Sequence, residues 1–412
     1  MGMPADPPAQ PADDPAEDAA RDRFAAETLD ALLALDTVAE AFYVPDGFRI
    51  SFLRKGAERQ AQVYLGNTYA ECQGATAEER AHRIGKLASI AALPELPENW
   101  AAMRPLLRTV LRQATFGQGF EPGKAPLARP ALPLLAELVV IDQPTAMRYV
   151  TVSEPEKWGV STEEVFAAGR ENLAAAAFGM AEQGEPAAAP AAFRLVEGGD
   201  DYYSSLPVLP GWLAAMARVA GGPPLAFVPE HSGLLLVGRS GDDAALVPLI
   251  EMVTDEFAQG VRRTSPVPYT VDADGAVVPF EVPPGNPAWN ALRKASVLLA
   301  ADVYGQQANR LREEYERAGE DVYVASYMQF AAQSGGRPFS VAAWTDGIES
   351  SLPRTDYIAM GPQDDSFLVP FDTVVAELAL TPEQDREPPR YRVGPWPQAA
   401  VVERFKAAAE RP

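Results

Sequence analysis

The segment from Arg148 to Leu173, RYVTVSEPEKWGVSTEEVFAAGRENL, constrains the fold most, because it predicts a strand, a turn and a helix with a fixed start. Ser161 is followed three residues later by Glu164, which is the spacing of a capping box at a helix N-terminus. The helix then repeats small and apolar residues at helical spacing, among them Gly169. Since glycine inside a helix costs roughly 1 kcal/mol relative to alanine, Gly169 predicts close approach by a neighbouring strand.

Asn172 lies on the same stripe of this predicted helix, and a buried amide needs hydrogen-bond partners. One interpretation is that the amide ties the helix to a neighbouring loop. The other is that it lines a pocket together with Arg112, Tyr202 and Ser205. These four residues are the candidate binding residues of the sequence, and we identify no catalytic and no metal-ligating residue.

Strand and helix patterns are interspersed along the 412 residues, and hairpin signals such as Asp274-Gly275 and Ser334-Gly335-Gly336 join several strand pairs. This indicates an α+β fold with mixed or antiparallel sheets and packed helices, in two to three subdomains. The predicted segments are a disordered acidic tail rich in Pro and Ala (1–21), an N-terminal α/β subdomain (22–113), a linker or loop (114–133), a central α+β domain (134–285) and a long helix with a small β-rich region (286–412).

Other helices are predicted outside the central segment. The first carries Leu29, Leu32 and Val38 on one face. Asn99 is expected to cap another, which runs through residues 106–111 even though Pro105 lies close to its first turns. A long helical pattern follows the proline-rich segment 282–287.

The net charge of −22 argues against several partners. Nucleic acids and anionic membrane surfaces attract basic proteins, so no nucleic-acid and no membrane partner is expected. The N-terminus has neither the basic nor the apolar region of a signal peptide, and no apolar run reaches the roughly 18 residues of a membrane span. We therefore expect a cytoplasmic protein.

Cofactor and metal chemistry have no support in the sequence. The single cysteine, Cys72, excludes an intrachain disulfide and is expected to be a buried thiol, and the two histidines, His82 and His231, are too few for a multi-histidine zinc site. Neither of the glycine-rich phosphate-binding motifs of nucleotide and dinucleotide enzymes occurs. No cofactor is predicted.

Several short motifs occur in order between about Gly47 and Phe280: Val110-Leu111-Arg112, Trp158, Asn172-Leu173, Asp201-Tyr202 with Ser205, Val228-Pro229 and Leu234-Leu235-Leu236. In order and spacing they resemble the YtpQ-like bacterial family (domain of unknown function 1444). The resemblance implies no known reaction and supplies no catalytic residue. Tyr203 stands where that family usually has Asp, and Ser232-Gly233 stand where it has Asp-Val. The residues after Asn286 form an extension that the resemblance does not cover.

A hydrolase is the alternative interpretation. His231-Ser232 is the one place where Ser follows His, but neighbouring residues in a turn point to opposite sides, which favours an ordinary turn. The segment from Gly238 to Asp242 approaches a nucleophile elbow around Ser240, yet its last residue is not glycine. Asp242 is better explained as a helix N-cap.

Two acidic groups have ordinary explanations. Asp272, Asp274 and Gly275 resemble the start of a calcium loop, but the later ligands are missing and a type I′ hairpin turn explains them. Asp255-Glu256, with Glu251, could serve acid–base chemistry, and exposed positions on an amphipathic helix explain them equally well.

Without a catalytic constellation, the sequence favours a non-enzymatic binding or accessory protein, with a nucleotide-independent hydrolase using Ser/His or carboxylates as the alternative. Aromatic residues of the C-terminal sheet, Tyr323, Tyr327, Phe330 and Trp344, favour protein partners. The sequence leaves the ligand, the oligomeric state and the role of the C-terminal extension open.

Overall fold

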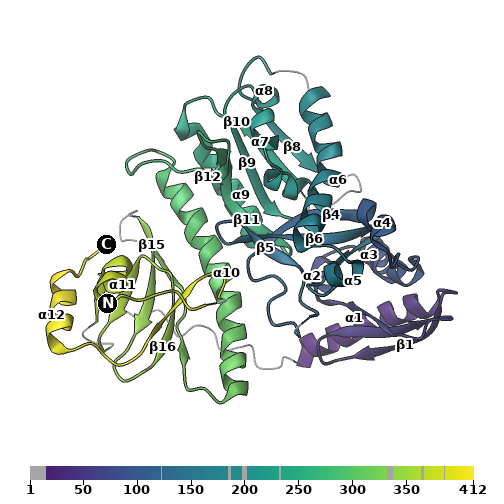
Figure 1. The fold of residues 1–412 in the computed structure, drawn as a ribbon, viewed down its shortest axis with the longest axis horizontal. Coiled ribbons are helices and arrows are strands. Elements are labelled where there is room, and N and C mark those ends of the chain that lie inside the picture. Colours follow the sequence, from purple (N-terminus) through teal and green to yellow (C-terminus); the bar gives the residue numbers. More distant parts are fainter. Residues whose placement is uncertain are drawn as a thin grey trace. The chain divides into compact units, whose positions relative to one another are not determined.

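The computed structural model describes residues 15–121, 123–183, 187–196, 202–231, 233–331, 337–362, 366–384 and 386–412. It shows an α+β fold in which helices pack on antiparallel and mixed sheets (Figure 1). The chain divides into two compact units. The first holds the residues up to Leu106 together with Ile141–Arg148, and the second holds Leu107–Val140 and Tyr149–Pro412. The predicted linker 114–133 thus falls inside the second unit, where it contains a strand, β5 (Ala128–Leu132).

The first unit packs helices on a small antiparallel sheet, in the order β1-β2-β3. Its elements are α1 (Pro15–Leu33), β1 (Val38–Val44), β2 (Arg49–Arg54), β3 (Ala61–Tyr64), α2 (Gly66–Glu71), α3 (Ala77–Ala88), η1 (Ser89–Ala92), α4 (Trp100–Met103) and η2 (Arg104–Leu106). Phe24, Leu32 and Phe52 form part of its core, and Cys72 is buried among them, as predicted.

Two predictions for this unit were wrong in detail. Of the predicted disordered tail, residues 1–14 lie outside the described residues, whereas Pro15 to Arg21 form the first turns of α1. Arg21 lies over the ring of Phe48, 4.4 Å from its centroid, which gives these turns a packing contact. Val38 starts a strand instead of continuing the first helix.

The helix predicted through residues 106–111 is also wrong. Asn99 does cap a helix, accepting a hydrogen bond from the Ala102 N–H at 3.0 Å, but α4 ends at Met103 just before Pro105. Residues Leu107–Gln113 form strand β4, most of whose side chains are buried. The apolar residues of β4, Leu107, Val110 and Leu111, stand three and four residues apart, which is also the spacing of a helix face.

Strand β4 of the second unit belongs to a sheet with the order β4-β6-β5, and β7 pairs with β6. The end of β6 from Ile141 onward and most of β7 belong to the first unit. The elements are β6 (Leu135–Gln143), β7 (Ala146–Tyr149), α5 (Glu154–Trp158) and α6 (Thr162–Gln183). Since β7 ends at Tyr149, the strand predicted from Tyr149 to Val152 starts and ends earlier than expected.

Helix α6 confirms the prediction made for the central segment. Ser161 Oγ accepts the Glu164 N–H at 3.2 Å, and the Glu164 carboxylate accepts the Ser161 N–H at 2.8 Å, so the capping box is complete. Val165 and Leu173 are buried. A Cβ added to Gly169 would lie 3.2 Å from the backbone of β4, which explains why glycine occupies this position.

A five-stranded antiparallel sheet follows, in the order β12-β11-β9-β10-β8. Its elements and their flanking helices are β8 (Ala192–Val196), η3 (Tyr203–Val208), α7 (Trp212–Ala215), α8 (Ala217–Ala220), β9 (Pro224–Glu230), β10 (Gly233–Gly238), η4 (Asp243–Leu246), α9 (Val247–Gln259), β11 (Arg263–Val271) and β12 (Val277–Pro279). The hairpin predicted at Asp274-Gly275 is present, but its loop is longer than a two-residue type I′ turn. The Asp272 carboxylate organises it by accepting the N–H groups of Asp274 and Ala276.

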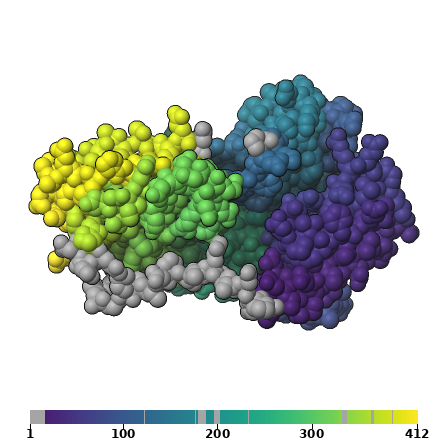
Figure 2. Space-filling view, turned by 90° about the horizontal axis from the view of Figure 1, so that it is seen from below, coloured from purple at the N-terminus to yellow at the C-terminus, as the bar shows by residue number. Residues whose placement is uncertain are grey.

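Helix α10 (Trp289–Ala318) contacts β11 and α9 and also the strands that follow it (Figure 1). These strands form two sheets, β13-β16-β19 and β14-β15-β17-β18. With two helices they make up the C-terminal module: β13 (Tyr323–Val324), β14 (Met328–Ala331), β15 (Pro338–Trp344), β16 (Ser350–Pro353), β17 (Tyr357–Met360), β18 (Phe367–Pro370), α11 (Phe371–Leu378), β19 (Arg390–Val393) and α12 (Ala399–Ala407). In Figure 2 the green residues of α10 adjoin the yellow-green residues of this module.

Candidate functional site

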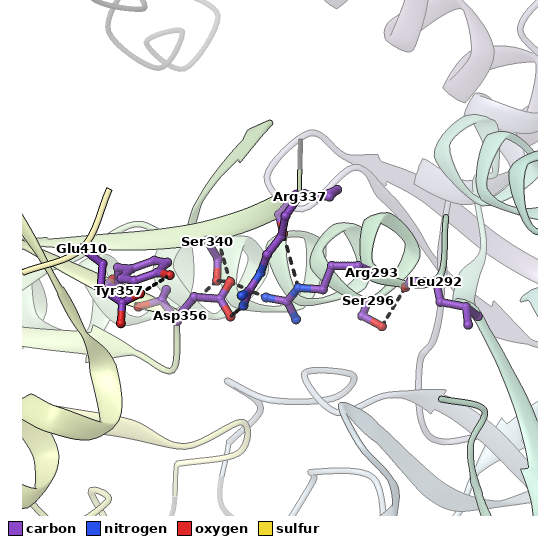
Figure 3. Close-up of polar contacts among 10 residues, drawn as sticks. Leu292, Arg293, Ser296, Arg337, Ser340, Asp356, Tyr357 and Glu410 are labelled. Carbon is purple, nitrogen blue, oxygen red and sulfur yellow. Dashed lines mark hydrogen bonds and ion pairs between the residues drawn. The ribbon is translucent and has the colours of Figure 1, made fainter. Parts of the chain in front are cut away.

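A groove of about 490 Å³ opens at the edge of the four-stranded sheet of the C-terminal module (Figure 3). We call it the dipolar groove because acidic and basic side chains line it in equal number. Its lining residues are Arg293, Tyr327, Arg337, Ser340, Arg354, Thr355, Asp356, Tyr357, Pro370, Asp372 and Glu410.

The topology of the sheet brings these residues together. Strands β15 and β17 are parallel, with Val341 opposite Tyr357, so the residues that precede or begin the two strands share one edge. Ser340 therefore lies beside Asp356, and Arg337 and Arg354 approach the groove from the segments leading into β15 and β17. Helix α10 supplies Arg293, and the residues after α12 supply Glu410.

Asp356 is the centre of a dense hydrogen-bond cluster. One of its oxygens, Oδ2, accepts the backbone N–H of Ser340 at 2.8 Å, the Ser340 hydroxyl at 2.9 Å and the guanidinium of Arg293. In return, the Asp356 N–H donates to Ser340 Oγ at 2.9 Å. Asp356 is only 18% exposed, and these bonds fix both Ser340 and Arg293.

Two arginines of the groove remain accessible. Arg337 is 47% exposed, and its ion pair with Asp356 is long, at 3.8 Å. Arg354 is 45% exposed and pairs with Asp372, a carboxylate that is itself 76% exposed. Ion pairs of exposed arginines contribute little to stability. An incoming anion can therefore take the place of Asp372 beside Arg354, or of Asp356 beside Arg337, at small cost.

The other side of the groove carries two tyrosines and Glu410. The Tyr357 hydroxyl donates to the Glu410 carboxylate at 2.9 Å. Burial, followed by this bond, raises the pKa of Tyr357, and burial also raises the pKa of Tyr327, so both phenols remain hydrogen-bond donors at neutral pH. The Tyr327 ring stacks on that of Tyr304 with 5.5 Å between centroids, which gives the groove a rigid wall.

The sequence motifs did not indicate this groove. Its arginines lie at positions 293, 337 and 354, on α10 and in the segments before β15 and β17; the parallel pairing of β15 with β17 unites the last two, and the packing of α10 on β15 adds the first. A weak signal exists in Arg354-Thr355-Asp356, a charged run directly before a strand.

Three of the four predicted binding residues lie together. Arg112 is buried and donates to the Tyr149 hydroxyl at 3.0 Å. Ser205 Oγ accepts the N–H of the neighbouring Leu111 at 2.9 Å, and the Ser205 N–H donates to the Tyr202 carbonyl. All three residues are therefore buried near the end of β4.

Asn172 lies elsewhere and is half-buried. Its side-chain amide donates to the Leu107 carbonyl at 2.9 Å, at the start of β4. Leu107 and Arg112 are five residues apart on one strand, which separates them by roughly 16 Å. This bond ties α6 to the first residue of strand β4, where the first interpretation expected a neighbouring loop.

The residues considered for a hydrolase are spread out. His231 precedes β10 and Ser240 follows it, so the length of the strand separates them, and the exposed Ser240 hydroxyl accepts the Asp242 N–H at 3.3 Å. Ser232 lies outside the described residues. Asp242 accepts the Ala244 N–H and so caps η4, as predicted.

Of the predicted acidic pair, Glu256 is clamped by Arg194 of β8 through two hydrogen bonds of 3.0 and 2.7 Å, while Glu251 and Asp255 are exposed on α9.

A buried carboxylate in the central sheet was not predicted. Glu137 of β6 is fully buried and accepts the Thr109 hydroxyl at 2.6 Å. Arg129 and Arg170 donate to it as well, at 2.6 to 2.8 Å. Both oxygens of Glu137 are engaged, so this cluster holds β4, β5, β6 and α6 together.

Neither protein-family models, curated proteins nor solved structures give a match to this chain. Within the described parts of the chain, no three His, Cys, Asp or Glu side chains are grouped closely enough to hold a metal ion. No described helix combines the length and the apolar character that a membrane span requires.

Proposed function

We propose that this protein is a non-enzymatic binding or accessory protein, and that the dipolar groove binds an anionic group of its ligand through Arg337 and Arg354. The observation that carries the proposal is the state of Arg337. Its side chain is 47% exposed, and its one described ion pair, at 3.8 Å, goes to Asp356 Oδ1, while Oδ2 of the same carboxylate accepts shorter hydrogen bonds from Ser340 and Arg293. Such an arginine is available for bidentate recognition of a carboxylate or a phosphate.

A binding role explains the groove better than a hydrolytic one. The Ser340 hydroxyl donates to the Asp356 carboxylate and accepts the Asp356 N–H, so its hydrogen bonds hold the segment before β17 against the start of β15. No histidine lines the groove to act as a base. We also propose that the protein is cytoplasmic, that it has a protein partner and that it is related to the YtpQ-like family. The single thiol, Cys72, is buried and is compatible with a reducing compartment.

The test is calorimetric titration of the purified protein with succinate and with inorganic phosphate at low ionic strength, since exposed charge pairs are screened by salt. We expect binding by the wild type and at least about tenfold weaker binding by Arg337→Gln, because hydrogen bonds to charged groups contribute about 1.5–3 kcal/mol. Lys294→Gln is the matched control, since Lys294 is an exposed cation beside Arg293 on α10 that does not line the groove.

If Arg337→Gln and Lys294→Gln weaken binding equally, the anions respond only to the net charge of the protein and the groove is not their site. If neither succinate nor phosphate binds the wild type, the proposal is refuted. Charge variants are preferable to deletion of the chain after Asn286. Helix α10 packs on β11 and α9, and its loss would expose the core of the five-stranded sheet.

A further inference from the structure

Four charged side chains of the dipolar groove, those of Arg293, Arg337, Asp356 and Glu410, follow one another in a definite order. In Figure 3, Asp356 lies between the Tyr357–Glu410 pair on one side and Arg293 with Arg337 on the other. The groove therefore has an acidic end at Glu410 and a basic end at Arg337, separated by a carboxylate that is already neutralised by Arg293.

Glu410 is a carboxylate with spare capacity. Its Oε2 accepts the Tyr357 hydroxyl at 2.9 Å, while none of the lysines and arginines that the structure describes forms an ion pair with it. Its position is nevertheless fixed, because the Glu410 N–H donates to the Leu368 carbonyl at 2.9 Å, in an isolated bridge to the edge strand β18. A held carboxylate with accepting capacity attracts a cationic donor.

We propose that the ligand of the dipolar groove is a zwitterion of the size of an amino acid or short peptide, with its ammonium group at Glu410 and its carboxylate at Arg337. The inference rests on the proposed function, because it assigns the second half of the same site. A simple anion at Arg337 would face Glu410 across the groove, and a simple cation at Glu410 would face Arg337. A ligand that carries both charges meets an opposite charge at each end.

The volume of the groove agrees with this class of ligand. Small-molecule sites occupy about 300–1,000 Å³, and the groove measures about 490 Å³. Its lining consists mostly of charged and hydroxyl side chains, which suits a ligand that is polar throughout. The stacked Tyr327 provides a flat surface for the ligand's backbone.

The experiment is a set of calorimetric titrations of the full chain with glycine, glycylglycine and triglycine, which tests the spacing of the two charges. N-acetylglycylglycine lacks the cation, glycylglycinamide lacks the carboxylate, and succinate is the anionic reference. We expect one member of the glycine series to bind best, and both blocked peptides to bind at least about tenfold more weakly than glycylglycine, as for the loss of a hydrogen bond to a charged group.

Glu410→Gln should remove the preference for glycylglycine over its N-acetyl form and leave succinate binding intact or stronger, since the glutamine oxygen can still accept the Tyr357 hydroxyl. Glu403→Gln is the control, because Glu403 is an exposed residue of α12 that pairs with Lys406 outside the groove.

The outcomes separate the two proposals. If succinate binds but acetylation changes nothing, or if Glu410→Gln keeps the full preference, the zwitterion assignment is wrong while the anion-binding function stands. If neither succinate nor phosphate binds, the anion-binding function is wrong, and the zwitterion assignment that rests on it falls as well.

Discussion

The buried Glu137 tests how burial changes the contribution of an ion pair to the unfolding free energy of this protein, because its partner Arg129 also pairs with an exposed glutamate. Arg129 donates to Glu137 through Nε and to Glu163 through Nη1, both at 2.8 Å. Glu137 is 0% exposed and Glu163 is 76% exposed. Glu137→Gln and Glu163→Gln therefore remove the same charge from the same partner at the same distance, in two environments.

The geometry gives the expected magnitudes. Glu137 Oε1 accepts from Thr109 and Arg170, and Oε2 accepts from Arg129 and Arg170. A glutamine keeps one oxygen, so its NH₂ group faces two donors whichever way the amide turns. Arg129 and Arg170 are 24% and 31% exposed and can turn partly to water. We therefore expect about 3 kcal/mol, the lower end of the cost of breaking a buried pair, and at most about 1 kcal/mol for Glu163→Gln.

The assay is equilibrium urea denaturation followed by tryptophan fluorescence and by circular dichroism. Trp212 is a suitable reporter, because it is fully buried and its indole N–H donates to the Ala177 carbonyl of α6 at 3.2 Å. Equal losses of unfolding free energy in the two variants would refute the reasoning, since Glu137 is buried and also accepts hydrogen bonds from Thr109 and Arg170, whereas Glu163 is exposed.

Two further predictions concern the second unit. Leu173→Ala should cost about 2–5 kcal/mol of unfolding free energy, because Leu173 is a buried residue of α6, whereas Ser161→Ala should cost about 1 kcal/mol for the lost cap. Chemical denaturation compares the two variants, and a smaller loss for Leu173→Ala would place α6 outside the core. Desolvation, then the charges of Arg112 and Arg262, lower the pKa of His231 well below its usual value. The folded state thus disfavours the protonated imidazole, and stability should fall as pH drops below about 6.5, by at most about 1.4 kcal/mol per pH unit from this group. Melts from pH 7.5 to about 5 should show a shallower loss in His231→Gln and an unchanged one in His82→Gln, whose histidine is exposed; an unchanged loss in both would contradict the assignment.

The helix α6 was predictable because its determinants are local. The capping box needs only Ser161 and Glu164, three residues apart. Gly169 lowers the helix propensity, and its presence therefore indicates that a neighbouring backbone approaches the helix closely. The failed helix at residues 106–111 shows the opposite case. Its residues satisfy a helical pattern, but β4 lies between neighbours that bury both of its faces, and this tertiary setting is absent from a local pattern.

The dipolar groove was not predictable for a related reason. No spacing rule links Arg293, Arg337 and Glu410, because they come from α10, from the segment before β15 and from the residues after α12. The predicted binding residues, by contrast, came from the part of the chain that carried recognisable motifs. Arg112 and Ser205 are held together there by hydrogen bonds to backbone groups of the core, which accounts for their polarity without a ligand.

The comparison of the two charged clusters gives the physical basis for assigning binding to one of them. Around Glu137, a fully buried carboxylate is matched by donors on every side, and a ligand would have to displace one of them. Around Asp356, Oδ2 is engaged in the same way, by Ser340 and Arg293, whereas Oδ1 faces Arg337 at 3.8 Å. Beyond that centre, however, Arg337 and Glu410 project their charges into an open groove, the first with a long ion pair and the second with a hydroxyl partner. A rigid interior that presents under-satisfied charges to solvent is the arrangement that a binding site needs, because the cost of holding those groups in place is met before the ligand arrives.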